Sequence, residues 1–63
     1  MENEEIYRYL FQLQESGRTN MFGAVPYMRR RFPHLTEWTA DEILGKWMDN
    51  YEEIQKALNI NID

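Results

Sequence analysis

Apolar residues recur at helical spacing in three stretches of the chain. The first stretch carries them at Ile6, Tyr9, Leu10 and Leu13, which share one helical face at about 100° per residue. Asn3 is a candidate N-cap, and Gly17 suits the left-handed position that ends many helices. This pattern predicts a helix from about residue 3 to residue 15.

The second stretch, residues 19–32, has the same periodicity but contains two helix breakers. Its apolar face consists of Met21, Val25, Met28 and Phe32. Gly23 and Pro26 fall on the opposite, solvent-facing side, where a proline removes one backbone hydrogen bond and bends the helix. We expect a helix kinked at Gly23/Pro26 and capped by Thr19 or Asn20. The alternative is a break, with a short turn at 21–24 and a helix in which Pro26 is the first residue.

The third stretch is the longest and predicts one helix over residues 40–58. Its apolar positions follow spacings of 4, 3, 4, 3 and 4, at Ala40, Leu44, Trp47, Tyr51, Ile54 and Leu58. Thr39 and Glu42 have the spacing of a capping box, and Trp38 and Ile43 that of a hydrophobic staple. Gly45 lies inside this helix at a cost of about 1 kcal/mol relative to alanine. The predicted helix therefore begins at the Thr39 cap.

Together the three patterns predict an all-α protein, a compact three-helix bundle. At 63 residues the chain has room for one small domain, which we assign to residues 1–58. A short C-terminal tail, residues 59–63, alternates polar and apolar residues but is too short to define a strand. The expected core is Ile6, Leu10, Leu13, Met21, Val25, Met28, Phe32, Leu44, Trp47, Tyr51 and Ile54.

The composition argues against catalysis and against a metal or cofactor site. The chain has no cysteine and a single histidine, His34, in the connection after the second helix, so thiolate chemistry and a His/Cys metal site are excluded. No phosphate-binding glycine loop is present. Adjacent carboxylates such as Asp41 and Glu42 point about 100° apart on a helix and do not converge on one substrate. We expect a protein that is not an enzyme, with no catalytic residue, cofactor or small-molecule substrate.

The same reasoning places the protein in the cytoplasm and away from membranes. No apolar run approaches the roughly 20 residues that a membrane-spanning helix needs. The first residues, Met-Glu-Asn-Glu-Glu, are acidic, whereas a secretory signal begins with basic residues.

Charge is distributed unevenly along the chain. Residues 1–15 carry a net charge of −3, residues 16–35 carry +4 and residues 36–63 carry −5. The basic middle segment suggests a helix-turn-helix nucleic-acid binder that uses Arg18, Asn20, Arg29 and Arg30. A total charge of −4 and a pI near 4.8 disfavour this alternative, because phosphate binders are usually basic.

The preferred interpretation is a protein-interaction or regulatory module. The spacing of the third helix is equally that of a coiled-coil seam, so the partner is either another protein or a second copy that forms a homodimer through this helix. Phe22 lies off the predicted core stripe beside the arginine cluster, and apolar residues of the third helix extend beyond its seam. The candidate partner-binding residues are Phe22, Tyr27, Arg29, Arg30, Ile43, Trp47 and Met48.

One stretch resembles a known group of proteins. Residues 19–24 read Thr-Asn-Met-Phe-Gly-Ala, followed by Pro-Tyr-Met at 26–28, Phe32 and a Trp-Met pair at 47–48. This pattern is similar to that of small uncharacterised helical proteins of tailed bacteriophages, over roughly residues 7–51. The resemblance implies a short helical protein made in the cytoplasm of an infected bacterial host, and it transfers no activity.

Overall fold

A computed structural model describes residues 3–60 of the chain, and helices dominate this span. The elements are α1 (Glu4–Ser16), the 3-10 turn η1 (Met21–Gly23), α2 (Ala24–Arg31), α3 (Glu37–Asp49) and α4 (Tyr51–Ala57). Within the described span no residue lies in a strand, so the all-α prediction is confirmed for it. Of the predicted tail, residues 61–63 lie outside the described part of the chain, and Asn59 and Ile60 directly follow α4.

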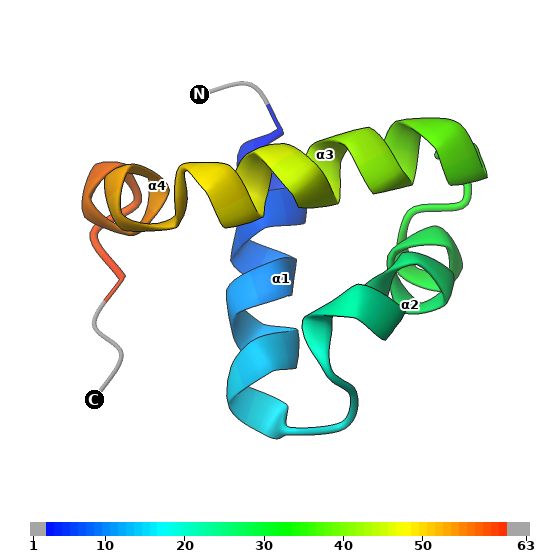
Figure 1. The fold of residues 1–63 in the computed structure, drawn as a ribbon, viewed down its shortest axis with the longest axis horizontal. Helices are drawn as coiled ribbons and strands as arrows, with labels where there is room; N and C mark the ends of the chain where they lie inside the picture. The colour runs from blue at the N-terminus through cyan, green and yellow to red at the C-terminus, as the bar shows by residue number, and fades with distance from the viewer. Residues whose placement is uncertain (1–2, 61–63) are drawn as a thin grey trace.

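The helices cross one another around one core. Figure 1 shows α3 lying across the molecule, with α1 crossing behind it at a steep angle. Helix α2 packs against α3 and α1, and α4 follows α3 at its far end with a changed direction. Residues 3–60 thus contain four α-helices where the sequence pattern predicted three.

The extra helix arises because the predicted helix over residues 40–58 breaks at Asn50. Asn50 has φ −118° and ψ 27°, outside the helical region, and its side-chain amide donates to the carbonyl of Lys46 at 3.1 Å. Asparagine competes in this way for backbone groups and is a poor residue for a helix interior. The single-helix prediction is wrong here. The apolar spacing continues across the break because both α3 and α4 turn their apolar residues towards the same core.

The beginning of α3 also differs from the prediction. Thr36, in extended conformation, is the N-cap: its hydroxyl oxygen accepts the backbone N–H of Thr39 at 3.0 Å. The predictions of a capping box that begins at Thr39 and of a staple between Trp38 and Ile43 are therefore wrong. For the staple, the two side chains lie in different surroundings, since Trp38 is 82% exposed and Ile43 only 6%. Thr36 has the same capping chemistry as Thr39 and lies three residues earlier, so α3 begins three residues before the predicted start.

The second predicted segment is a turn followed by a short helix. The side-chain oxygen of Asn20 accepts the N–H of Gly23 at 3.0 Å and closes η1, and α2 begins at Ala24. This arrangement resembles the predicted alternative, except that α2 begins two residues before Pro26. In the first turn of a helix the backbone N–H has no intrahelical partner, so Pro26 removes no hydrogen bond and α2 needs no proline kink.

The core is close to the predicted one. Its buried members are Ile6, Tyr7, Leu10, Phe11, Leu13, Ala24, Met28, Phe32, Leu35, Ala40, Ile43, Leu44, Trp47, Ile54 and Leu58. Met21, Val25 and Tyr51, which we expected in the core, are only partly buried against it. Trp47 lies at the centre, with ring centroids 5.2 Å from Phe11 and 5.1 Å from Tyr51. These edge-to-face contacts join α3 to both α1 and α4.

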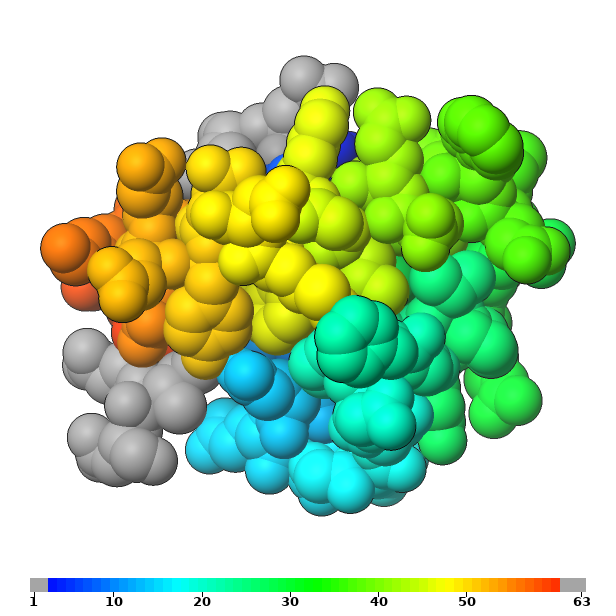
Figure 2. Space-filling model, in the orientation of Figure 1, coloured from blue at the N-terminus to red at the C-terminus, as the bar shows by residue number. Residues whose placement is uncertain are grey.

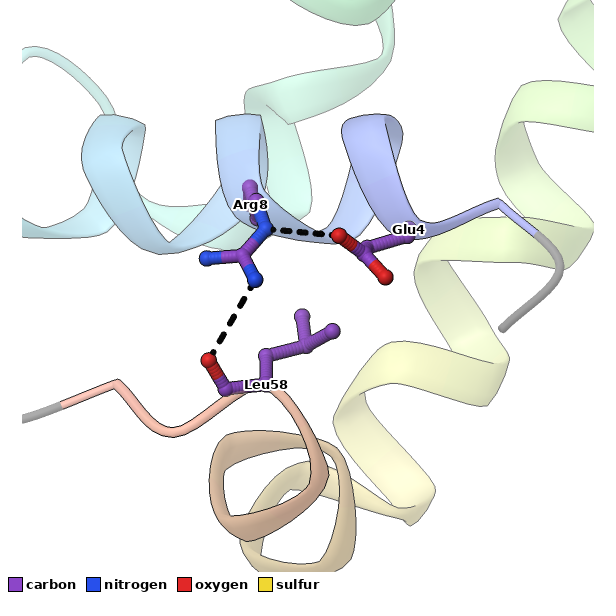
Figure 3. A network of polar contacts seen from close by, with 3 residues as sticks. All are labelled: Glu4, Arg8 and Leu58. Carbon is purple, nitrogen blue, oxygen red and sulfur yellow. Dashed lines mark hydrogen bonds and ion pairs between the residues drawn. The ribbon is translucent and has the colours of Figure 1, made fainter.

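A polar contact joins α1 to the end of α4 (Figure 3). The guanidinium of Arg8 pairs with Glu4 one turn earlier, at 3.1 Å, and donates to the backbone carbonyl of Leu58 at 3.4 Å. Basic side chains favour the C-terminal ends of helices, where carbonyls lack intrahelical partners. Arg8, whose side chain is about half exposed, thus links α1 to the C-terminal end of α4.

The chain leaves α4 through a left-handed residue. Asn59 has φ 56°, its N–H donates to Lys56 O, and the N–H of Ile60 donates to Gln55 O, both at 3.1 Å. This pair of bonds is a Schellman motif. It returns Ile60 to the core surface, against which its side chain packs.

Candidate functional site

Two large apolar side chains remain outside the core. Phe22 is 86% exposed and Trp38 is 82% exposed, and they are the only large hydrophobic residues so exposed within residues 3–60. Exposed aromatic residues in a chain that otherwise buries its apolar side chains commonly mark an interaction surface. The site is therefore sought around these two rings.

Phe22 and Trp38 line the same hollow. Its walls come from Phe22 and Val25 on one side and Glu37, Trp38 and Asp41 on the other, and its volume is about 580 Å³. We call these five residues the Phe22–Trp38 groove. Figure 2 shows the segment around η1, in teal, lying against the green and yellow surface of α3 on one face of the molecule. The groove is open to solvent and runs between the two segments.

Short polar side chains hold the two aromatic residues in place. Asn20 caps η1, and a Cβ added to Gly23 would lie 2.7 Å from the hydroxyl oxygen of Thr19. Only glycine fits there without a shift of Thr19, so the chain makes a tight turn next to Phe22. On the other wall, the Thr36 cap makes Trp38 the second residue of α3.

Two carboxylates complete the groove. Glu37 and Asp41 are four residues apart on α3, so they lie on the same side of the helix. Both are exposed, and within residues 3–60 neither takes part in an ion pair. The groove therefore combines aromatic and aliphatic surface with negative charge. Aromatic faces bind apolar groups and cations, and carboxylates bind cations and hydrogen-bond donors.

The groove contains one residue of the predicted partner-binding set, Phe22. Ile43 and Trp47 are 6% and 1% exposed and belong to the core, so neither is available to a partner in this fold. Tyr27 and Met48 are half-buried. The remaining two members, Arg29 and Arg30, are exposed in the last turn of α2.

The residues predicted to bind nucleic acid do not lie together at the N-terminus of α2, as they would in a recognition helix. Asn20 uses its side-chain oxygen to cap η1, and Arg29 donates to the backbone carbonyl of Leu35 at 3.4 Å. Arg18 lies exposed in the connection between α1 and η1, and Arg30 at the C-terminal end of α2. A helix-turn-helix protein reads bases mainly with the N-terminal residues of its recognition helix, and the first two residues of α2 are Ala24 and Val25.

The partner-binding residues predicted from the sequence do not include Trp38, Glu37 or Asp41. The predicted cap at Thr39 places Trp38 in a hydrophobic staple instead. The signal that could have shown the exposure of Trp38 is Thr36, the first residue of the run Thr-Glu-Trp-Thr. When Thr36 is the cap, Trp38 lies in the first turn of α3, which faces solvent there. Val25 is predicted to lie in the core and is instead half-buried in the wall of the groove.

The described residues give no sign of two other kinds of site. Between residues 3 and 60 no three His, Cys, Asp or Glu side chains are grouped as metal ligands would be. In the same span no helix is both long and apolar enough to cross a bilayer. The sequence matches no protein-family model, and comparisons with curated proteins and with solved structures gave no match.

Proposed function

We propose that this protein is a non-enzymatic interaction module that holds a segment of a partner protein in the Phe22–Trp38 groove. The observation that carries the proposal is the exposure of Phe22 and Trp38, 86% and 82%, on the walls of one hollow. Keeping two such rings in water gives up the free energy that their burial would contribute, about 1.5–3 kcal/mol or more for each large side chain. A partner that covers them recovers this free energy.

The size of the groove sets the strength of binding. A buried aromatic side chain contributes 150–250 Å², so covering both rings removes roughly 300–400 Å² from water and yields about 8–10 kcal/mol before any cost. Association costs an estimated 4–15 kcal/mol. The groove by itself therefore supports weak, reversible binding, typical of a regulatory contact, and tight binding requires further contacts around its rim.

Self-association through the predicted coiled-coil seam is less well supported than partner binding. Five seam residues are buried in the chain's own core: Ala40, Leu44, Trp47, Ile54 and Leu58. The sixth, Tyr51, is half-buried and donates a hydrogen bond to Gln14 at 2.8 Å. A dimer through this seam would have to expose the core first. The resemblance to phage-encoded proteins directs the search for a partner to the cytoplasm of a bacterium.

The proposal is tested by comparing three immobilised proteins as baits in a bacterial lysate. These are the original protein, the groove variant Phe22→Ser/Trp38→Ser and the control variant Arg18→Ser/Arg30→Ser. The control removes two exposed residues of the basic segment and leaves the groove intact. Circular dichroism first establishes that all three are folded, and quantitative mass spectrometry then measures the proteins retained.

We expect at least one protein to be retained by the original chain and by the control, and to be lost from the groove variant. If every retained protein binds all three baits equally, the groove is not the site. If binding is lost with the arginines instead, the basic segment is the binding surface and the proposal is wrong. Light scattering at several concentrations shows whether a second copy of the chain is among the partners.

A further inference from the structure

On the basis of the proposed function, we infer that the bound segment carries an arginine or lysine beside its apolar side chain, and that Glu37 and Asp41 bind this cation next to the ring of Trp38. The inference rests on the charges of the groove and on their missing partners. It names the class of protein segment that the groove accepts.

Two other acidic residues of the described span, one on α1 and one on α3, have a basic partner on their own helix. Glu4 pairs with Arg8 at 3.1 Å, and Glu42 pairs with Lys46 at 3.7 Å, each with a basic residue one turn later. In these pairs the chain supplies its own counter-charge at the position where a helix brings two side chains together.

Glu37 and Asp41 have no such counter-charge. The residue one turn after Glu37 is Asp41 itself, and the residue one turn after Asp41 is Gly45, which has no side chain. Like charges at this spacing repel each other. The helix dipole favours a negative charge at Glu37 in the first turn, but this effect falls off within that turn and does not account for Asp41. Because the two carboxylates line the same hollow as the exposed rings, they give it a negative charge that a cationic group of a ligand would neutralise.

The aromatic wall favours the same ligand. A guanidinium or ammonium group is attracted to the face of a tryptophan more strongly than to other rings. The aliphatic stem of arginine or lysine can lie along Phe22 and Val25 while the charged group reaches the carboxylates. An acidic segment would meet two carboxylates of its own sign, so the groove discriminates against it.

The test uses three acetylated and amidated pentapeptides of known sequence. They are Leu-Arg-Leu-Arg-Leu, Leu-Gln-Leu-Gln-Leu and Leu-Glu-Leu-Glu-Leu, which have the same apolar residues and differ only in the polar side chain at the second and fourth positions, which is positive, neutral or negative. Each is titrated into the ¹⁵N-labelled full chain while the indole N–H signals of Trp38 and Trp47 are followed by NMR. Trp47 is an internal reference, because it is buried in the core.

The arginine peptide should shift the Trp38 signal in a saturable way and bind roughly threefold to tenfold more tightly than the glutamine peptide, as expected for two partly exposed charge pairs. The glutamate peptide should bind most weakly. The variant Glu37→Gln/Asp41→Asn should bind the arginine and glutamine peptides about equally. The matched variant Glu52→Gln/Glu53→Gln, which removes the same charge from α4 at the other end of α3, should retain the preference.

Each other outcome has a definite meaning. If all three peptides shift Trp38 with similar affinity, or if the α4 variant loses the preference as well, the inference is wrong while the groove remains a docking site. If no peptide shifts Trp38 at millimolar concentration, both the inference and the proposed function are contradicted. If the Trp38 signal moves with protein concentration alone, the occupant is a second copy of the chain and the inference is overturned.

Discussion

The two tryptophans of the chain provide a sharp test of the structure, because one lies in the core and the other on the surface. Trp47 is 1% exposed and packs edge-to-face against Phe11 and Tyr51. Trp38 is 82% exposed on the wall of the groove. Replacing each by alanine removes the same atoms from two very different surroundings.

The expected losses of stability differ several-fold. Truncating a buried tryptophan to alanine typically costs 3–5 kcal/mol. At about 0.05–0.15 kcal/mol per residue, a chain of 63 residues has only about 3–9 kcal/mol of total stability, so Trp47→Ala leaves little of the fold. Trp38 buries less than a fifth of its surface, about 45 Å² of roughly 250 Å², and its removal costs at most about 1 kcal/mol. Alanine's higher helix propensity recovers about half of that.

Urea unfolding followed by circular dichroism measures both losses. A milder core variant, Trp47→Phe, keeps an aromatic ring and removes the indole N–H, which is buried without a hydrogen-bond partner in the described part of the chain, so it should cost less than Trp47→Ala. Fluorescence provides an independent check. Trp38→Ala should leave blue-shifted emission that resists acrylamide quenching, and Trp47→Phe should leave red-shifted emission that is readily quenched. A loss above about 2 kcal/mol for Trp38→Ala would mean that Trp38 is packed in the fold, and the groove would not be available to a partner.

Three further predictions concern the ends and interior of the helices. Each is measured by thermal unfolding, in which a change of 1 kcal/mol in the free energy of unfolding should shift the Tm by about 4–8 °C. Gly17→Ala should destabilise the fold by about 1–2 kcal/mol because Gly17 has φ 69°. Gly45→Ala should stabilise it by about 1 kcal/mol because nothing lies within 4 Å of the added Cβ. Changes in stability of the same sign for both variants would contradict the two helix assignments. Asn59→Gly should stabilise by a few tenths of a kcal/mol up to about 1, because Asn59 has φ 56° in the Schellman turn, and a clear loss would argue against that turn. Thr36→Ala should cost about 1 kcal/mol and Thr39→Ala less than about 0.5, because Thr36 is the cap of α3; the reverse order would restore the cap to Thr39.

Much of the helical structure could be predicted because local signals agree with one another. In α1 the apolar spacing and Gly17 indicate the same ends, and the observed helix, Glu4–Ser16, differs from the expected one by one residue at each end. The start of α3 could not be decided in this way. Thr36 and Thr39 have the same hydroxyl chemistry, and which one caps the helix depends on the path of the preceding loop. The break at Asn50 was missed because a continuous apolar pattern does not require a continuous helix.

The candidate site was predictable only in part. Phe22 was recognised because it falls off every apolar stripe, and the structure leaves it exposed. Trp38 is not among the predicted site residues, because its exposure follows from the position of the α3 cap. Trp47 was proposed as a partner residue because periodicity cannot distinguish a face that covers the chain's own core from one that awaits another protein. Packing decides this, and Trp47 is buried.

The most direct measurement of the central claim traps whatever occupies the groove inside living cells. A photoreactive benzoylphenylalanine is incorporated in place of Phe22 or, as a control, in place of the exposed Gln12 on α1. The cells are irradiated, and the adducts are separated and identified by mass spectrometry. The account predicts a discrete covalent adduct with another protein from position 22, absent from position 12, and lost when Trp38→Ser is combined with the photoreactive residue. No adduct at position 22, or one that forms equally from position 12 and survives Trp38→Ser, would contradict it.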